Sequence, residues 1–373
     1  MENLSKLTLV IPSYNRQQYL ARNLHYWSGK DVWVIALDGS PKRIGSDLLK
    51  GLDQNVSYFH LPSSLRERLW SVNNHLQTKY MALLADDDFY LPSGLKAAIN
   101  FLEENPDYSA CIGRPTGFGY DLGSGVFGIP GIYNDMNIDY NINSNSPGQR
   151  MVDHMGRYMP STMYAVLRSK NWDKTIGAFV RREFPVFAMV ELQMELSTSY
   201  IGKSMVLPIL SWLKSTELEQ ISGPDPSLIR TIEFHDLWPN EGDATNFRAE
   251  FTSSMAEVLC DVDERPRAVV GSEIEAAMDA YVAWWYYYIR KYVPFYGARE
   301  YMKRVLPARV TNMITSYLRA HRLRLNAKQG KQGLLALGKQ LKDNGIFVDM
   351  AELQDIVDYI QNFHLNQEAA RGF

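Results

Sequence analysis

The stretch YMALLADDDFYLP (residues 80–92) ends an apolar run on three consecutive aspartates. The run at 80–85 has the length and the composition of a buried strand. Three adjacent carboxylates repel one another, and burying them without compensation would cost several kcal/mol. They therefore form either a solvated acidic turn or a place where a cation binds. This stretch alone leaves both interpretations open.

Three more strands are predicted before this one, and a helix separates each from the next. Strands are predicted at 6–12, 31–40 and 56–62, and helices at 15–27, 45–54 and 66–77. This order, with short connections, is typical of an α/β fold with a doubly wound, mostly parallel sheet flanked by helices. Ligands of such sheets lie at the carboxyl ends of the strands. The aspartates lie at such an end, as do the turns PSYN (12–15) and DGS (38–40).

Beyond the aspartates, a helix is predicted at 91–108, a strand at 161–168, and a helix followed by a strand at 184–214. Residues 113–150 are rich in Gly, Asn, Tyr and Pro, which is typical of either a pair of irregular strands or a loop over a site. Their aromatic residues favour the covering loop. The segment SGPDPS (222–227) indicates a boundary, and the chain after it is mainly helical. We therefore expect one domain at 1–220 and a helical C-terminal domain at 221–373.

Composition excludes several classes of protein. The chain has 373 residues and a formal net charge of −3, which gives no general attraction to nucleic acid. Its two cysteines, Cys111 and Cys260, lie far apart, so neither a disulfide framework nor a structural zinc site is expected. No segment has the pattern of a signal peptide or the apolar length of a membrane span. The expected location is the cytoplasm.

The segment 301–342 carries ten Lys or Arg residues and no Asp or Glu. Such a segment is attracted to an anionic membrane surface by about 1 kcal/mol per basic residue, and the aromatic stretch at 283–296 lies next to it in the sequence. The alternative is a solvated helix face that pairs with the acidic final helix, within one chain or across a homodimer. The sequence leaves peripheral membrane attachment and subunit pairing both open.

Carboxylates at the carboxyl edge of a parallel sheet are well placed to hold a hard divalent cation. Mg²⁺ and Mn²⁺ prefer oxygen ligands, and Mg²⁺ commonly takes one or two carboxylates together with water and substrate phosphates. A metal on a diphosphate acts as a Lewis acid for a nucleotide leaving group. Mn²⁺ or Mg²⁺ is therefore the expected cofactor.

Three segments together resemble the N-terminal signatures of inverting, family 2-like glycosyltransferases of the GT-A fold. They are LTLVIPSYNR (7–16), VWVIALDGS (32–40) and KYMALLADDDFYLPSGL (79–95). The resemblance covers about residues 6–215 and is strongest over the first hundred. It implies transfer of a sugar from a nucleotide-diphosphate donor, with a UDP-sugar favoured, to a glycan or lipid-linked acceptor hydroxyl. The implied pathway is synthesis of a surface polysaccharide.

The resemblance also implies roles for individual residues. The first turn lies by the nucleobase and ribose, Asp38 bonds the base, Asp86 faces the ribose or donor sugar, and Asp88 holds the metal. The chain has Leu37-Asp38 where the family usually has two aspartates, so the base itself stays open. The helix before the aspartates offers Arg66, Arg68, Asn73 and Asn74 for the donor phosphates, and we favour Arg68. The implied donor-binding residues are thus Pro12, Ser13, Tyr14, Arg16, Asp38, Arg68, Asp86 and Asp87.

An inverting reaction needs a base that takes the proton of the acceptor hydroxyl. In the family this base is an acidic residue about eleven positions before a glycine-initiated strand. The segment GKSMVLP begins at Gly202, and counting back leads to Glu191. Glu195, about one helical turn further on, is the second candidate. The alternative is that both are ordinary glutamates on a helix.

Two other functions compete with this one. A nucleotidyltransferase would usually carry a glycine-rich loop after the first strand, and this chain has PSYNRQQYL (12–20) there instead. A non-catalytic carbohydrate-binding or scaffold protein derived from a GT-A fold is the stronger alternative. Metal-dependent binding of a nucleotide-sugar distinguishes the enzyme from the scaffold.

Overall fold

A computed structural model describes residues 4–130, 140–159, 162–184, 188–217, 238, 245–292 and 332–371. One mixed sheet organises the chain, with strand order β3-β2-β1-β4-β9-β6-β10-β5. Its first four strands are parallel: β1 (Leu7–Ser13), β2 (Trp33–Asp38), β3 (Val56–His60) and β4 (Tyr80–Leu83). Ser13 pairs with Asp38 in register, so β1 and β2 end at one edge. The predicted carboxyl edge therefore exists.

The second half of the sheet is mixed rather than parallel. The short β9 (Val166–Arg168) runs antiparallel between β4 and β6 (Tyr108–Asp121). The long β10 (Lys203–Ser215) runs parallel to β6, and β5 (Phe89–Tyr90) and β8 (Asn141–Ile142) pair antiparallel with β10. The expectation of a mostly parallel sheet thus holds for the N-terminal half. The direction in which a strand pairs depends on partners far away in the sequence, so local patterns do not predict it. The two-residue β5 directly follows the aspartates, so its sequence cannot be told apart from the turn that they form.

The helices between the parallel strands follow the predicted pattern. They are α1 (Gln17–Trp27), α2 (Ser46–Leu49) and α3 (Leu65–Ser71), continued by the 3₁₀ turn η2 (Val72–Asn74). Ser64 and Glu67 form a capping box that fixes the start of α3. After β5 comes α4 (Pro92–Glu104), which begins on a proline in its first turn. These elements confirm the β-α-β-α-β-α-β order.

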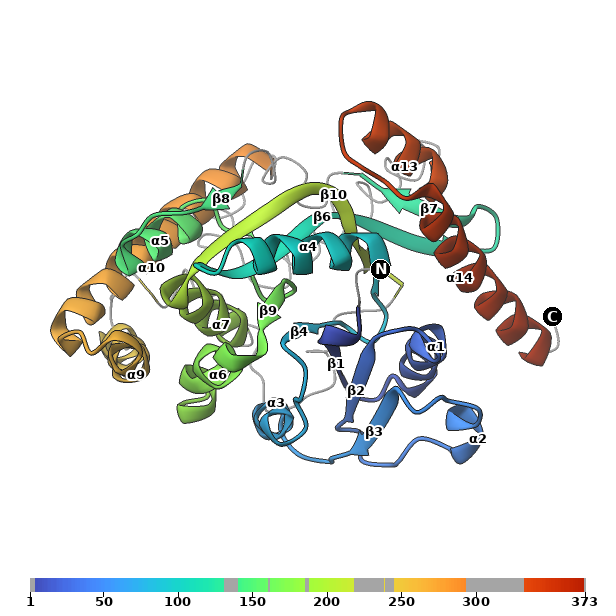
Figure 1. The fold of residues 1–373 in the computed structure, drawn as a ribbon, viewed down its shortest axis with the longest axis horizontal. Coiled ribbons are helices and arrows are strands. Elements are labelled where there is room, and N and C mark those ends of the chain that lie inside the picture. Colours follow the sequence, from blue (N-terminus) through green and yellow to red (C-terminus); the bar gives the residue numbers. More distant parts are fainter. Residues whose placement is uncertain are drawn as a thin grey trace, which may run out of the picture.

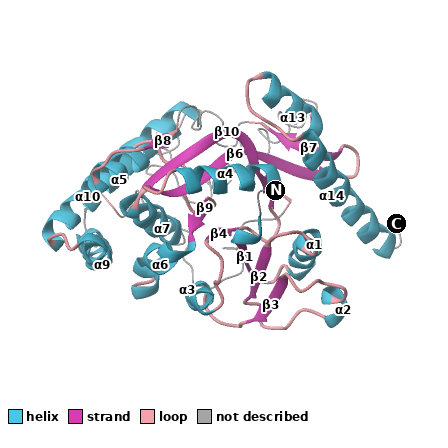
Figure 2. Cartoon of the chain, in the orientation of Figure 1, coloured by secondary structure: helices cyan, strands magenta, loops and turns pink. Residues whose placement is uncertain are grey.

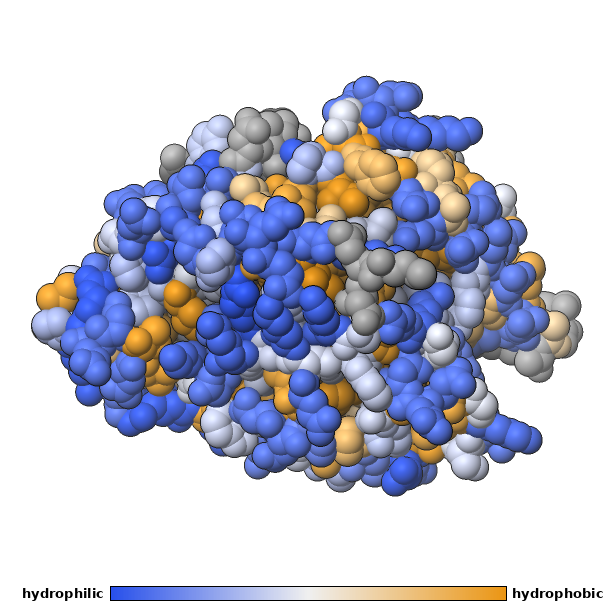
Figure 3. All heavy atoms as spheres, viewed as in Figure 1, coloured by the Kyte–Doolittle hydropathy of each residue, from blue (hydrophilic) through white to orange (hydrophobic). Residues whose placement is uncertain are grey.

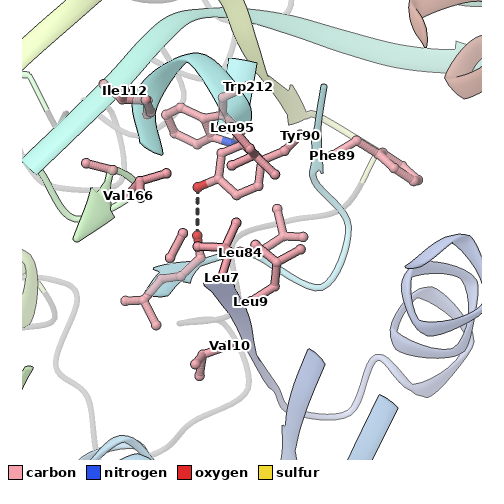
Figure 4. Close-up of a cluster of buried hydrophobic side chains, with 14 of the residues drawn as sticks. Leu7, Leu9, Val10, Leu84, Phe89, Tyr90, Leu95, Ile112, Val166 and Trp212 are labelled. Carbon is pink, nitrogen blue, oxygen red and sulfur yellow. Dashed lines mark hydrogen bonds between the residues drawn. The ribbon is translucent and has the colours of Figure 1, made fainter. Parts of the chain in front are cut away.

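The core lies between the sheet and its helices. Figure 4 shows Leu7, Leu9 and Val10 of β1 near Leu84, with Tyr90 and Trp212 on the other side of the cluster. The Tyr90 hydroxyl is buried and lies within hydrogen-bond distance of two carbonyl oxygens, those of Leu83 (2.7 Å) and Tyr164 (2.6 Å). The apolar runs of the sequence are therefore buried on both faces, as central strands of such a sheet require.

The remaining helices lie in two groups (Figures 1 and 2). A second apolar cluster joins α5 (Pro147–Met155), α6 (Trp172–Arg181) and α7 (Ala188–Ile201) to α9 (Thr245–Asp263) and α10 (Arg267–Tyr292). On the other side of the molecule, α13 (Leu334–Asp343) and α14 (Met350–Arg371) pack on β7 (Gly125–Ile129) and on the main core. The described helices after residue 245 thus lie on two flanks of the sheet. The boundary expected near residue 220 falls outside the described residues.

Residues 113–129 form most of β6 and the β6–β7 hairpin, which is the paired-strand alternative of the sequence analysis. Residues 131–139 of the expected covering loop lie outside the described part of the chain. Most of the basic segment, 301–331, lies outside it too. Within the described ranges, none of the helices has the length and apolarity needed to cross a membrane. The face shown in Figure 3 is mostly hydrophilic, with apolar side chains in separate patches.

Candidate active site

The turn after β1 binds the first of the three aspartates. Ser13 Oγ donates a hydrogen bond of 2.6 Å to one oxygen of Asp86, and Arg16 Nη1 lies 3.3 Å from the other. Arg16 also lies 3.5 Å from Asp87 Oδ1. Asn15, with φ at 55°, adopts the left-handed conformation that Asn tolerates, and this turns the chain back toward the aspartates. The structure thus brings together Ser13, Arg16, Asp86 and Asp87, as predicted.

The third aspartate points toward β10. Asp88 Oδ2 accepts a hydrogen bond from Trp212 Nε1 (2.9 Å), and Oδ1 accepts one from the Ser215 backbone N–H (2.7 Å). Asp88 therefore fastens the end of β10 to the end of β4. Asp87 carries neither contact, and its side chain is 8% exposed. Of the three carboxylates, Asp87 is the most accessible and the least occupied by hydrogen bonds.

Two buried polar residues of α1, Arg22 and Asn23, hold the backbone of the aspartate turn. Asn23 Nδ2 lies 2.8 Å from the Asp88 carbonyl, 3.2 Å from the Asp86 carbonyl and 3.4 Å from the Ala85 carbonyl. Arg22 Nη2 donates to the Asp87 carbonyl at 3.0 Å. Both side chains are buried in a helix whose neighbouring positions are apolar. Neither residue was among those predicted from the sequence, although a polar residue at a core position of a helix is a signal that could have indicated it.

Replacing Asn23 with alanine is expected to lower the free energy of unfolding by about 1–3 kcal/mol, because buried carbonyls lose their donor. Urea denaturation of the variant measures this loss. Gln18→Ala, at an exposed position of the same helix, is the matched control and should change stability by less than about 0.5 kcal/mol. Equal stability of Asn23→Ala and the wild type would contradict this role.

The three carboxyl groups share an unusual electrostatic environment. Burial raises the pKa of Asp86 to about 7, and the neighbouring charge of Asp87 adds to this shift, against the hydrogen bond from Ser13. Burial and Asp87 likewise raise the pKa of Asp88 to about 7. Burial also raises the pKa of Asp87, while Arg16 and Arg22 act in the opposite direction. Burial and the mutual repulsion of neighbouring carboxylates thus favour the protonated form of these groups more than in an exposed acidic turn.

The end of β2 is built around Asp38. Its Oδ1 accepts from the Ser40 backbone N–H (2.9 Å), and its Oδ2 accepts from Tyr58 Oη (2.7 Å) and Gln17 Nε2 (3.2 Å). A cavity of about 470 Å³ opens beside it, lined by residues 15, 17, 18, 40–42 and 48. Its lining combines amide, hydroxyl and apolar groups.

Arg68 lies at the predicted edge of the sheet, where its side chain donates hydrogen bonds to backbone carbonyls. Its Nη1 donates to the Ser13 carbonyl (2.7 Å) and the Leu37 carbonyl (3.2 Å), so it joins the ends of β1 and β2. Gly39 permits this, since a Cβ at Gly39 would lie 2.4 Å from Arg68 Cζ. The glycine of the DGS turn is therefore required by the close approach of Arg68.

The two candidate bases have different environments on α7. Glu195 is fully buried, and its carboxylate accepts hydrogen bonds from His154 Nε2 (2.8 Å), the Met163 N–H (2.8 Å) and the backbone and hydroxyl of Thr162. Glu191 is half-buried and accepts one from the Tyr158 hydroxyl. Burial raises the pKa of Glu191, against the hydrogen bond from Tyr158 and the charge of Lys214, which lower it. Of the two carboxylates, Glu191 is the more exposed.

Lys214 of β10 connects the two parts of the site. Its positive charge opposes the effect of burial on the pKa of Asp88 and also on that of Glu191. The ammonium of Lys214 therefore acts electrostatically on both the aspartate turn and the candidate base. Lys214 was not among the site residues predicted from the sequence.

The N-terminal part of the chain matches a known protein family. Residues 8–156 match the family model described as glycosyl transferase family 2. This part of the chain, less than half of its length, is similar to glycosyl transferase family 2. It contains β1, α1 and β4, which build the aspartate turn, but not β10. The GT-A glycosyltransferase fold expected from the sequence is confirmed.

Crystal structures of TarS from S. aureus are also similar to the chain. TarS 1–349 in complex with UDP-GlcNAc has a TM-score of 0.44 and 14% identity, over 74% of this chain and 72% of that chain. TarS 1–349 without a named ligand has a TM-score of 0.40 and 13% identity, over 76% of this chain and 91% of that one. A comparison with curated proteins gave no match.

The strand end of the glycosyltransferase domain fits a divalent cation in part. Its buried aspartates carry negative charge that a cation would neutralise, and Asp87 and Asp88 each retain oxygen lone pairs. Within the described ranges, no group of three or more His, Cys, Asp or Glu side chains is arranged to hold a metal. Such a site suits an ion that takes few protein ligands and completes its sphere with water and donor phosphates.

Proposed function

We propose that the protein is a metal-dependent inverting glycosyltransferase that transfers a sugar from a nucleotide-diphosphate donor, with UDP favoured. The observation that supports this most is the set of buried carboxylates with raised pKa at the carboxyl edge of a family 2 domain. An ion there would be held by Asp88, with Asp87 beside it, and would supply Lewis acidity toward the donor diphosphate. The nucleobase would lie in the cavity beside Asp38.

The chain's own residues supply the remaining chemistry. Glu191 takes the proton of the acceptor hydroxyl, and its raised pKa makes it a better base than an exposed carboxylate. Lys214 provides positive charge near the place where charge develops on the leaving group. Ser13, Arg16, Arg22 and Asn23 keep the aspartate turn rigid, which is the preorganisation that such stabilisation needs.

The acceptor in this proposal is a glycan or a lipid-linked saccharide of a surface polysaccharide pathway. The support is the family resemblance together with the basic segment 301–342, whose charge would favour an anionic membrane surface. Peripheral attachment at the cytoplasmic face and pairing of two subunits through the C-terminal region remain the two proposals for this segment. Sedimentation with anionic and neutral vesicles distinguishes them.

Isothermal titration of UDP, GDP and their common sugars, with Mn²⁺ and with EDTA, tests the proposed function. We expect one nucleotide to bind in Mn²⁺ and to lose most of its affinity in EDTA. If the protein is folded and binds none of these nucleotides, the proposal of a metal-dependent transferase is wrong. That result would favour the non-catalytic carbohydrate-binding alternative instead.

The raised carboxyl pKa values predict how stability depends on pH. The ordinary pKa is 3.8 and the folded value is about 7 for Asp86 and Asp88, so the folded state binds more protons between these pH values. The free energy of unfolding contributed by these groups is therefore largest at acidic pH and falls as the pH rises through about 7. Added Mn²⁺ should reverse this loss, because it binds the ionised carboxylates. Melting temperatures measured between pH 5 and 8.5, with and without Mn²⁺, check this prediction. An increase in melting temperature by Mn²⁺ that is equal at pH 5 and at pH 8.5 would contradict it.

A further inference from the structure

The C-terminal helix α14 contacts the elements that surround the aspartate turn. Both oxygens of Glu352 accept hydrogen bonds from the Ser93 backbone N–H (3.0 and 2.9 Å), in the first turn of α4. Tyr359 Oη donates to the Arg22 carbonyl at 2.8 Å. Figure 1 shows α14 running from β7 toward α1. Its buried residues Leu353, Ile356 and Ile360 join the main core.

The last turns of α14 surround the Arg22 side chain, which is fully buried. The Phe363 ring lies 5.0 Å from its guanidinium carbon, and the rings of Tyr19 and Phe89 lie 4.6 and 5.2 Å from it. Three rings around one guanidinium stabilise the buried charge by cation–π attraction. Phe363 therefore fixes the position of the residue that donates to the Asp87 carbonyl.

A second path leads from α14 to the same turn through Glu217, which follows β10. His364 Nε2 donates to Glu217 Oε1, and Arg22 Nη1 donates to Glu217 Oε2 at 2.8 Å. The Glu217 side chain is 3% exposed and that of His364 is 15% exposed. A buried ion pair is favourable only when its remaining lone pairs are also satisfied. Among the described residues, His364 provides the hydrogen bond to Glu217 Oε1.

The pKa of the Glu217 carboxyl is consistent with these two hydrogen bonds. Burial alone would raise the pKa of its carboxyl, but the hydrogen bonds from His364 and Arg22 hold that pKa below its usual range. Glu217 thus stays ionised beside Arg22. Without His364, one buried carboxylate oxygen would lose its donor, and the Arg22–Glu217 pair would be free to move away from the Asp87 carbonyl.

We propose that Phe363 and His364 are positioning residues of the donor site, which act through Arg22 and Glu217 on the Asp87 turn. This inference rests on the proposed function, because it assigns α14 a part in binding the metal and the donor diphosphate. The helix is then a component of the active site rather than a separate appendage. The contact between His364 and Glu217 joins residues 147 positions apart in the sequence, and that between Arg22 and Glu217 joins residues 195 positions apart.

The test compares three variants of the full chain: His364→Ala, His364→Gln and Gln354→Ala. The glutamine amide can donate to Glu217 as the imidazole does, so His364→Gln is the conservative rescue. Gln354 is exposed on the same helix and donates a hydrogen bond to Asp358, one helical turn further on, so Gln354→Ala is the matched control. The readouts are the Kd for the best-bound nucleoside diphosphate in Mn²⁺, and hydrogen exchange of the peptide covering residues 84–92.

We expect His364→Ala to weaken nucleotide binding about 10- to 100-fold, as loss of an outer contact of a metal site commonly does. We also expect faster exchange in residues 84–92, recovery of both readouts in His364→Gln, and no change in Gln354→Ala. Unchanged affinity and unchanged exchange in a folded His364→Ala would overturn the inference. If the wild type binds no nucleotide, the proposed function fails, and the exchange readout still decides whether His364 positions the turn.

Discussion

Glu191→Gln is expected to lower the rate of sugar transfer by about 10²- to 10⁴-fold, the usual contribution of a general base. The amide keeps the size of the side chain and the contact with Tyr158, but it cannot take a proton. Nucleotide binding should therefore stay close to that of the wild type. The measurement is the turnover of donor and acceptor at saturation, compared with the Kd of the donor nucleotide.

The pH profile provides a second check on Glu191. Burial raises the pKa of its carboxyl, and the base acts only when ionised, so the rate should rise with pH through that pKa. The variant should lack this acidic limb. Full activity in Glu191→Gln would show that another group takes the proton.

Glu195→Gln is the control that separates catalysis from structure. Its carboxylate accepts hydrogen bonds from His154, Thr162 and Met163 and is fully buried. An amide nitrogen there would face one of these donors, and we expect a loss of about 1–3 kcal/mol in the free energy of unfolding. A variant that folds normally but has no activity would instead make Glu195 the base.

The second large effect is expected from substitutions in the aspartate turn. Asp87→Asn and Asp88→Asn should both weaken nucleotide binding, but they should change the melting temperature in different ways. Both substitutions remove a carboxylate from the strand end, and we expect each to weaken Mn²⁺-dependent nucleotide binding at least about tenfold. Asp87→Asn should keep or raise the melting temperature, because the charge of Asp87 adds to the raised pKa of both neighbours. Asp88→Asn should lower it, because an amide cannot accept from both Trp212 and Ser215.

Titration of Mn²⁺ and nucleotide against both variants, with melting curves of the same samples, makes this comparison. Loss of stability without loss of binding in Asp88→Asn would mean that Asp88 only joins β4 to β10. Asp87 would then be the ligand of the cation. Normal binding in both variants would remove the metal from the proposal altogether.

Much of the N-terminal half was predictable because its signals are local. An apolar run between turn residues predicts a buried strand wherever its partners lie, and the runs at 6–12 and 80–85 became β1 and β4 with small shifts at their ends. Parallel strands place their carboxyl ends at one edge, so Ser13, Asp38 and Asp86 were expected near one another. The bond between Ser13 and Asp86 confirms this.

Several features depended on long-range contacts and were not predictable from pattern. The spacing to Gly202 leads to Glu191, but only the packing of α7 shows that Glu195 is already occupied by His154 and Thr162. Arg68 was expected near phosphates, and the structure shows it holding the carbonyls of Ser13 and Leu37. The Arg68 guanidinium reaches these carbonyls because Gly39 has no side chain that would occupy its place. Secondary-structure propensities do not predict such a close approach.

The sequence by itself predicted the alternation of strands and helices in the N-terminal half, the edge at which the carboxylates gather and the resemblance to family 2-like glycosyltransferases. Each of these features follows from short apolar runs and from motifs whose residues lie a few positions apart. Only the tertiary structure decided that Asp88 faces β10, that Asp87 stays accessible and that α14 reaches the turn through Glu217. These depend on contacts between residues more than a hundred positions apart, whose geometry is set by packing of the whole core.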